Sequence, residues 1–351
     1  MSIEQIISDK KSWNKTIEGF SNNDIYFLFE YFIPFRNNND GDPLLFFYKC
    51  SHGKVAYPFM VRDISVSNDF KKKLGKKKYY DIRSAYGYGG SLYELFENGD
   101  MEALKKQFST SFSKFCRKEN IISQFDRFHP IIKNHILFEG LCEVSKNRKT
   151  VYMDIGNKEI IWENITSKCR NMIRKAKKNG IRIEIDETGV SLEQFKDIYN
   201  KSMDRNKASD YYYFNNSFFN DTFHSLNNKI FIANAFYNKR IIASSLILRH
   251  KKYLHYHFSG TLKEYMKLAA NNMIIYEAAK WGSDNGYKVF HLGGGYESQG
   301  DSLYRFKKSF SKLEDKDFYI GKQIYNNEAY NFLIGISGKE KNADFFPAYR
   351  S

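Results

Sequence analysis

Residues 253–295 read YLHYHFSGTLKEYMKLAANNMIIYEAAKWGSDNGYKVFHLGGG, and this stretch carries the pattern that decides the fold. Residues 253–259 are mostly aromatic, which predicts a strand, and apolar residues then recur near helical spacing from Leu268 to Trp281. Residues 287–292 predict a second strand that runs into a glycine cluster. Because a helix separates the two strands, we expect a crossover that makes them parallel neighbours with the helix on one face.

Two further strands precede this unit, and a basic aromatic run follows it. Residues 230–236 and 241–248 are rich in β-branched and aromatic side chains, and short polar connections separate them from each other and from residue 253. Such connections join antiparallel neighbours, so the three strands form a meander. The run Tyr304-Arg305-Phe306-Lys307-Lys308-Ser309-Phe310 comes after the glycines and gives the unit a cationic end.

The first half of the chain has a similar mixed pattern. Strands are predicted at 44–48, 55–61 and 121–125, and residues 101–118 form an amphipathic helix. A length of 351 residues with 42% hydrophobic content favours two domains over one. We therefore expect an α/β fold with mixed sheets, divided into residues 1–149 and residues 150–351.

The chain is strongly basic, with 55 Lys and Arg against 40 Asp and Glu and a formal net charge of +15. This balance favours an anionic partner such as a nucleic acid, a nucleotide-linked sugar, a phosphate-bearing cofactor or an acidic membrane surface, although solubility alone also accounts for it. Residues 1–15 lack the apolar core of a signal peptide, so a cytoplasmic location is expected. Residues 25–35 are too short and too polar for a transmembrane segment, so any contact with the inner membrane surface would be peripheral.

Residues 160–180 predict a helix with one basic face. An apolar stripe runs along it, and no acidic residue lies between Thr166 and Gly180. The face is either a solvated surface or a binding surface for the phosphate backbone of tRNA or another polyanion. A lack of aromatic residues on this face argues against sequence-specific recognition of bases.

The segments 268–282, 287–295 and 303–310 resemble the Fem branch of the GNAT acyltransferase superfamily. Fem proteins are similar to non-ribosomal peptidyltransferases that add amino acids from aminoacyl-tRNA to a peptidoglycan precursor, either lipid II or a UDP-linked peptide. The resemblance covers most of residues 75–320 and implies two GNAT-like domains in tandem, with the transfer site in the second. This chain has no room for the long helical-hairpin insertion of many Fem proteins, so it resembles the compact members.

The resemblance also implies roles for single residues. Lys307 occupies the position of the Fem lysine associated with the transferred group and with transition-state charge, and Tyr256 resembles a Fem active-site tyrosine. Lys307 could equally be a solvated lysine at a helix end, and the adjacent Lys308 allows a register error. Strand alternation places Tyr256 on the face opposite to His255 and His257, so the three line one cleft only if the strand contains a bulge.

Precursor contacts are implied in two places. The first is the tyrosine- and glycine-rich loop at 79–90. Composition alone fits two interpretations of this loop equally well: a ligand-binding loop, or a tight turn whose tyrosines pack at a domain boundary. The second is the segment 203–214. Its arginine could instead form a surface ion pair, and its tyrosines could instead be packing residues. The candidate contacts are Asp81, Arg83, Tyr86, Tyr88, Arg205, and Tyr211 or Tyr213.

The donor is the more open part of the prediction. The usual GNAT cofactor loop, R/Q-x-x-G-x-G/A, is replaced by Lys267-Leu268-Ala269-Ala270-Asn271-Asn272, which weakens an acetyl-CoA interpretation. Candidate donor contacts are Lys267, Asn271, Asn272, Phe306 and Lys308. No G-x-S-x-G elbow or H-E-x-x-H motif is found, so direct transfer without a covalent enzyme intermediate or a metal is expected.

These observations leave three functions open. The first is amide formation on an amine of a cell-envelope precursor, with no bound cofactor and aminoacyl-tRNA as co-substrate. The second is an acyl-CoA-dependent N-acyltransferase that modifies an amino sugar or another small amine for surface polysaccharide synthesis. The third is an inactive module that only binds polyanions.

Overall fold

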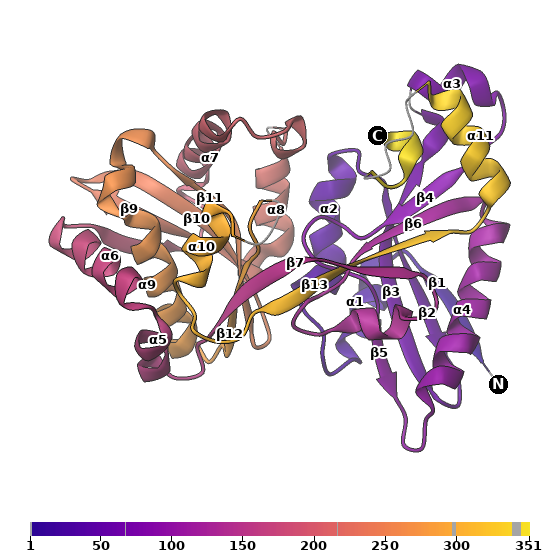
Figure 1. The fold of residues 1–351 in the computed structure, drawn as a ribbon, viewed down its shortest axis with the longest axis horizontal. Helices are drawn as coiled ribbons and strands as arrows, with labels where there is room; N and C mark the ends of the chain where they lie inside the picture. The colour runs from indigo at the N-terminus through magenta and orange to yellow at the C-terminus, as the bar shows by residue number, and fades with distance from the viewer. Residues whose placement is uncertain (1, 67, 216, 297–299, 339–344) are drawn as a thin grey trace. The chain divides into compact units, whose positions relative to one another are not determined.

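The computed structural model describes residues 2–66, 68–215, 217–296, 300–338 and 345–351, and the chain forms two compact units (Figure 1). Unit 1 consists of Met1–Asn147 and Phe318–Ser351, and unit 2 of Arg148–Asp317. The chain enters unit 2 within β7 (Glu143–Asp154) and leaves it within β13 (Lys316–Ile324). The expected division near residue 149 therefore needs one correction, because the C-terminal residues belong to the first unit.

Unit 2 contains the predicted meander and crossover. Strands β9 (Ile230–Tyr237), β10 (Arg240–His250) and β11 (Tyr253–Thr261) pair antiparallel in sequence order. Helix α9 (Ala270–Asp284) then leads into β12 (Val289–Gly293), which is parallel to β11. The outer neighbours are β8 (Arg182–Asp186) beside β9 and β7 beside β12, both antiparallel. The periodicity of the sequence thus predicted the meander of β9 to β11, helix α9 and the parallel pairing of β11 with β12, but not the outer neighbours β7 and β8.

Helices pack on the sheet of unit 2 in two groups. Helices α5 (Lys158–Asn164) and α6 (Ser167–Lys178) contact α9, and this group shares a hydrophobic core with Phe231 and Leu254. Helix α7 (Leu192–Asn206) packs on β10 and β11 and is joined by α8 (Phe218–Leu226). The predicted basic helix at 160–180 is divided at Thr166, whose hydroxyl caps the first turn of α6 by accepting from the Cys169 amide at 3.3 Å.

Unit 1 repeats the strand–helix–strand crossover. Its strand order is β1 (Ile3–Ile7), β2 (Asp42–Lys49), β3 (Gly53–Asp63), β4 (Tyr80–Arg83), β6 (Ile121–Arg127) and β13, with β5 (Leu92–Leu95) beside β3. Strands β4 and β6 are parallel, and helix α4 (Met101–Lys118) lies between them in sequence. The predicted mixed α/β fold with two related units is therefore confirmed.

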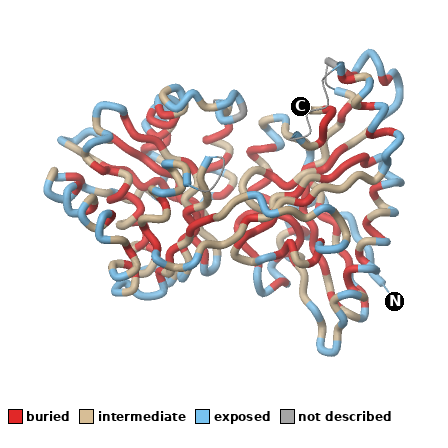
Figure 2. The backbone as a smooth tube through the Cα atoms, in the orientation of Figure 1, coloured by how far each residue is buried: buried red, intermediate tan, exposed pale blue. Residues whose placement is uncertain are grey.

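Each unit has its own core, and buried residues follow the strands of both (Figure 2). In unit 1 the apolar stripe of α4, which includes Phe108 and Phe112, packs on Phe46 and Phe59 of the sheet. The remaining α-helices of unit 1 are α1 (Lys10–Glu18), α2 (Phe29–Asn37), α3 (Asn68–Leu74) and α11 (Asn327–Ser337).

The longest described helices of unit 2, α7 and α9, have 15 residues each, so the described part of unit 2 contains no long helical hairpin. Among the described residues, no helix is both long enough and apolar enough to cross a bilayer.

Candidate active site

Strand β11 contains a β-bulge at the position of the predicted catalytic tyrosine. Leu246 of β10 pairs with Phe258 and Ile247 pairs with Tyr256, so His257 is an extra residue in β11. Tyr256 packs against the core that contains α9, whereas Phe258 contacts the aromatic rings of α7 and α8. Simple alternation would put Tyr256 and Phe258 on one face, so the bulge redirects the strand at this point.

The pairing of the two parallel strands ends close to this bulge. The register of β11 with β12 runs from Tyr253↔Val289 to His255↔His291. Strand β12 ends two residues later at Gly293, which has a φ of +76°. A glycine adopts this left-handed conformation without steric cost, and it turns the chain into the glycine loop, defined here as residues 293–296.

The environment of Tyr256 keeps its phenol protonated. Burial raises the pKa of Tyr256, and the neighbouring hydroxyls of Ser259 and Ser245 only partly oppose this effect. The adjacent His257 is half-buried, and desolvation, assisted by repulsion from His255, lowers the pKa of its imidazole to about 3. At neutral pH this part of β11 therefore offers a neutral phenol and a neutral imidazole.

Lys307 is a buried cation beside the glycine loop. It is the buried residue of helix α10 (Ser302–Lys308), with 9% of its surface exposed, and its Nζ donates to the carbonyl of Gly294 at 2.7 Å. Burial lowers the pKa of Lys307 to about 8; Asp301 opposes this shift and Arg148 adds to it. Most Lys307 side chains are therefore still charged at pH 7, in a site with little water to screen the charge.

The glycine loop is held in one conformation by charged groups. Arg148 donates from Nη1 to the carbonyls of Gly295 at 3.0 Å and Tyr296 at 2.6 Å, so three successive carbonyls face Lys307 and Arg148. Asp301 accepts from the Tyr296 amide with one oxygen and caps α10 with the other, each at 2.8 Å. A Cβ added at Gly295 would overlap the Asp301 carboxylate, so a side chain at this position would have to displace Asp301.

Arg205 contacts the C-terminal end of β11 and interacts electrostatically with Tyr296. Its Nη1 donates to the Thr261 carbonyl at 2.6 Å, which ties α7 to the end of the strand. Burial raises the pKa of Tyr296 while the Arg205 charge lowers it, and Tyr296 in turn raises the pKa of Tyr256. Arg205, Tyr296 and Tyr256 are thus close enough in unit 2 to interact electrostatically.

The structure separates the two lysines of the basic aromatic run. Lys308 donates to the Leu313 carbonyl at 2.6 Å and to Asp315 at 2.9 Å, away from the glycine loop. Lys307 is therefore the lysine of this run that contacts the glycine loop, and its catalytic role stays a prediction. Phe306 makes an edge-to-face contact with Phe310.

The other donor candidates lie around the start of α9. Lys267 is exposed, whereas Asn272 is buried and its amide contacts the sulfur of Cys169 at 3.6 Å. The side-chain oxygen of Asn271 is buried and accepts no hydrogen bond from the described residues. Helix α9 itself begins after Ala269, whose φ is +59°, and has no side-chain cap.

The candidate precursor contacts are distributed over both units. Asp81 and Arg83 lie on β4 of unit 1 in ion pairs, and Tyr86 and Tyr88 are half-buried there against Arg127 and against Tyr26. In unit 2, Tyr213 is 41% exposed, and the side chain of Tyr211 lies outside the described residues. All of these assignments stay predictions.

Sequence reasoning missed Arg148, Tyr296 and Asp301. Asp301 had a local signal, because an Asp followed by a short helical segment is a common N-cap. Arg148 had none, since it reaches the glycine loop from a residue 147 positions away in sequence.

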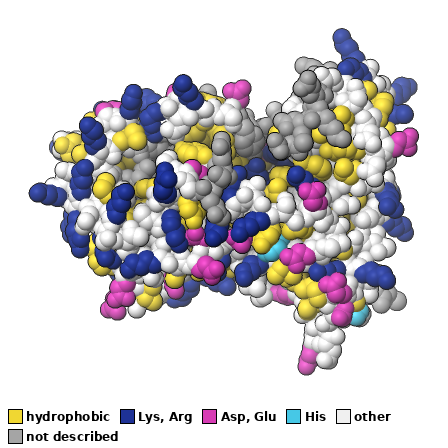
Figure 3. Space-filling view, viewed as in Figure 1, with side chains coloured by type: hydrophobic (Ala, Val, Ile, Leu, Met, Phe, Trp, Pro, Cys, Tyr) yellow, Lys and Arg dark blue, Asp and Glu magenta, His cyan; other side chains and the backbone are white. Residues whose placement is uncertain are grey.

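The basic face of α6 is exposed, and basic side chains gather on this side of unit 2 (Figure 3). Arg170 is an exception, since it donates to the carbonyls of Trp162 and Ile165 and so joins α6 to α5. The exposed members are Lys168, Arg174, Lys175, Lys177 and Lys178.

Comparison with known proteins supports the fold. Residues 164–308 match the family model of the acetyltransferase (GNAT) domain. A crystal structure of FemX superposes with a TM-score of 0.66 at 12% identity, over 94% of this chain and 99% of that one. The structure of L-PGS from Bacillus licheniformis gives a TM-score of 0.54 at 12% identity, over 91% of this chain and 93% of that one. No curated protein matches the sequence.

Residues 164–308 therefore form a GNAT domain, and the whole chain has a Fem-like fold. The matched segment contains Lys307, Tyr256 and Arg205. The protein is an acyltransferase, and the low identities limit the likeness to FemX and L-PGS to the fold.

Proposed function

We propose that this acyltransferase transfers an aminoacyl group from aminoacyl-tRNA to an amine of an anionic cell-envelope precursor, either lipid II or a UDP-linked peptide of peptidoglycan. The observation that carries the proposal is the buried cation Lys307 beside the glycine loop of the GNAT domain. The Fem-like fold of the whole chain supports the choice of reaction. If the precursor is lipid-linked, the protein would meet it at the inner membrane surface.

Lys307 would stabilise the charge that develops during amide formation. The attacking amine converts the ester carbonyl of the donor into a tetrahedral oxyanion, and a preorganised cation in a poorly hydrated site stabilises that charge more than water does. The ammonium has three donor hydrogens, and the Gly294 carbonyl accepts one of them. Two hydrogens therefore remain for the reacting oxygen.

Tyr256 would manage the proton. As the new C–N bond forms and the ester C–O bond breaks, the amine loses a proton and the departing ribose oxygen gains one. A phenol with a raised pKa stays protonated at neutral pH, so it can donate to the leaving oxygen while accepting from the amine. The tRNA then leaves with a free hydroxyl, and no covalent enzyme intermediate is required.

Two features support tRNA as the donor. The exposed basic face of α6 fits a phosphate backbone, because Lys and Arg side chains release counterions when they bind one. The segment Lys267–Asn272 also lacks the glycines of an acyl-CoA loop, and Asn272 is packed against Cys169.

One observation favours acyl-CoA as a second candidate donor. Helix α9 begins without a side-chain cap, and such an N-terminus can receive a pyrophosphate through its free amides. The acceptor would then be an amino sugar or a related small amine.

A transfer assay separates the candidates. The purified protein is incubated with charged tRNAs carrying labelled amino acids, or with labelled acyl-CoAs, and with UDP-linked peptide, lipid II or glucosamine as acceptor. The proposal expects label on the peptide precursor and its loss after ribonuclease treatment of the charged tRNA. Transfer that survives ribonuclease and needs acyl-CoA would establish the second candidate. If no donor supports transfer while tRNA still binds, the chain is a polyanion-binding module.

A further inference from the structure

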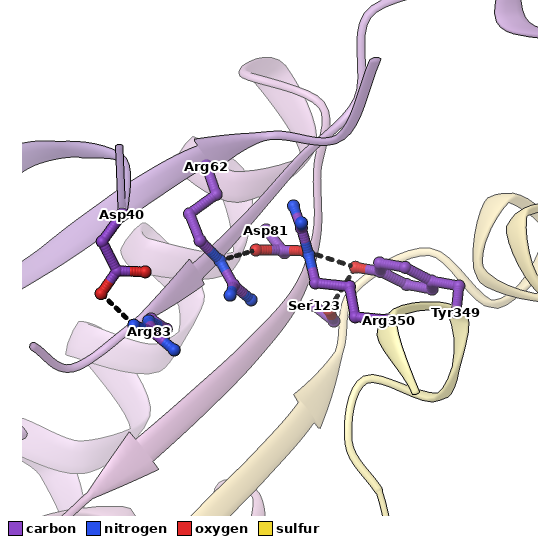
Figure 4. Close-up of polar contacts among 7 residues, drawn as sticks. All are labelled: Asp40, Arg62, Asp81, Arg83, Ser123, Tyr349 and Arg350. Carbon is purple, nitrogen blue, oxygen red and sulfur yellow. Dashed lines mark hydrogen bonds and ion pairs between the residues drawn. The ribbon is translucent and has the colours of Figure 1, made fainter. Parts of the chain in front are cut away.

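Three neighbouring strands of unit 1 place a row of polar side chains on one face of the sheet. Arg62 of β3 pairs with Asp81 of β4, and Asp81 pairs in turn with Ser123 of β6. Arg83 lies two residues beyond Asp81 and so shares its face. Figure 4 shows these side chains together, with Asp40 beyond Arg83.

The C-terminal turn Ala348–Arg350 covers this row. The Tyr349 side chain is 1% exposed, and its hydroxyl lies 3.1 Å from Asp81 Oδ2 and 2.8 Å from Ser123 Oγ (Figure 4). Arg350 Nε donates to Asp81 Oδ2 at 2.5 Å, and Arg62 Nε donates to Asp81 Oδ1 at 2.6 Å. The buried Asp81 carboxylate is therefore surrounded by two guanidinium groups and a phenol.

Positive charge exceeds negative charge in this cluster. Arg83 forms an ion pair with Asp40, so among the described members of the cluster three arginines face two carboxylates, a net charge of 3 − 2 = +1. Burial lowers the pKa of Arg62; Asp81 opposes this shift, while Arg350 and Arg83 add to it by repulsion. An arginine remains charged in spite of such a shift, so the excess charge persists at neutral pH.

The cluster also has unused hydrogen-bond donors. Arg62 and Arg350 each engage Asp81 through Nε alone, and their terminal nitrogens donate to no other side chain or carbonyl among the described residues. One of these nitrogens, Arg350 Nη2, is buried without a partner in that part of the chain. A buried donor without an acceptor is costly, so the site favours an incoming acceptor.

The cluster is accessible from solvent at its arginines. The side chains of Arg62, Arg83 and Arg350 are 16%, 18% and 22% exposed, whereas Asp81 is 1% exposed. The arginine side chains are thus more exposed than the Asp81 carboxylate, which lies behind them. The planar guanidinium matches the paired oxygens of a phosphate or a carboxylate.

We propose that Arg62, Arg350 and Arg83 form an oxyanion-binding site in unit 1, which takes a phosphate or carboxylate group of a ligand. Asp81 holds two of the arginines through Nε and leaves their terminal nitrogens for the ligand. The site belongs to unit 1, while the acyl-transfer residues Lys307 and Tyr256 belong to unit 2, and the inference does not depend on the transfer reaction. The competing explanation is an ion-pair network that only attaches the C-terminal turn.

Binding of simple anions tests the proposal directly. Isothermal titration calorimetry at constant ionic strength uses inorganic pyrophosphate, inorganic phosphate and acetate as separate probes, so that general screening is held fixed. We expect saturable binding of at least one probe, and the preferred probe distinguishes a phosphate site from a carboxylate site. Arg350→Met should weaken that binding about tenfold or more, which is the usual effect of losing a charge-assisted hydrogen bond.

Two variants make the test specific. Arg117→Met removes an equal charge from an exposed position at the end of α4 and should change the affinity less than about twofold. Asp81→Asn keeps all three arginines but removes the carboxylate that holds Arg62 and Arg350 through Nε, so it should weaken binding about threefold or more. Circular dichroism melts check that each variant is folded.

The proposal fails if no probe binds saturably to the wild-type protein. It also fails if Arg117→Met weakens binding as much as Arg350→Met does, or if folded Asp81→Asn binds the probe as tightly as the wild type does. Lys307→Met should bind the probe as the wild type does, so a failure of the transfer hypothesis leaves this result unchanged.

Discussion

Lys307→Met should lower the activity of this protein strongly while changing its stability little. The fall of the Lys307 pKa from 10.5 to about 8 corresponds to about 3 kcal/mol of unfavourable free energy for keeping the charged side chain buried at neutral pH. Methionine has a similar length and no charge, so this cost disappears. The Gly294 carbonyl loses its donor, which costs about 1–3 kcal/mol. The two effects nearly cancel, and we expect the free energy of unfolding to change by less than about 2 kcal/mol.

Activity should respond very differently. Loss of one preorganised donor to an oxyanion typically lowers kcat by about 10²–10³. The measurement is the single-turnover rate of amide formation with saturating donor and acceptor, together with urea unfolding of the same preparations. Lys312→Met is the matched control, since Lys312 is exposed and donates to the Glu163 carbonyl and not to the glycine loop; its rate should stay within about threefold of wild type.

Two results would refute this reasoning. If the Lys307→Met variant forms the amide at a near wild-type rate, the buried charge does not act on the reacting group. A Lys312→Met variant that is folded and equally impaired would show that the effect comes from loss of any positive charge in this segment and not from Lys307.

Three further outcomes are expected. Transfer should decline as pH rises through about 8, where Lys307 loses its proton. The unfolded chain keeps that proton to about 10.5, so Lys307 makes stability increase with pH between these values; urea unfolding at pH 7 and pH 9 should show this increase in the wild type relative to Lys307→Met. Tyr256→Phe should lower the single-turnover rate about 10²-fold or more with little change in melting temperature, and a wild-type rate would remove the phenol from the mechanism. Gly295→Ala should displace the glycine loop from Asp301 and lower both melting temperature and rate, whereas an unchanged melting temperature would show that the loop can adjust.

Much of the fold follows from local sequence pattern. The aromatic and β-branched runs at 230–259 are the strands β9 to β11, and helical periodicity places α9 between two parallel strands. These features are predictable because side-chain alternation and helical spacing depend on neighbours in sequence. The sequence did not predict whether β11 contains a bulge. The extra residue, His257, is defined only by the register of β11 with β10, which involves a separate segment of the chain.

The candidate site was predictable in part for the same reason. Lys307 and Tyr256 could be named from a local resemblance, but the burial that lowers the pKa of Lys307 could not be derived from their neighbours in sequence. The return of residues 318–351 to unit 1 also escaped prediction, because strand β13 pairs with β6 across nearly 200 positions of chain.

The amino-acid sequence by itself determined the periodic elements, the basic charge and the lysine-containing run after the glycine cluster. Only the tertiary structure decided which lysine of that run is buried and which arginines surround Asp81. Arg350 and Asp81 are 269 positions apart in sequence, and Arg148 and Gly295 of the glycine loop are 147 positions apart. Hydrophobic spacing is a property of consecutive residues, whereas burial and charge pairing depend on segments that meet only when the chain has folded.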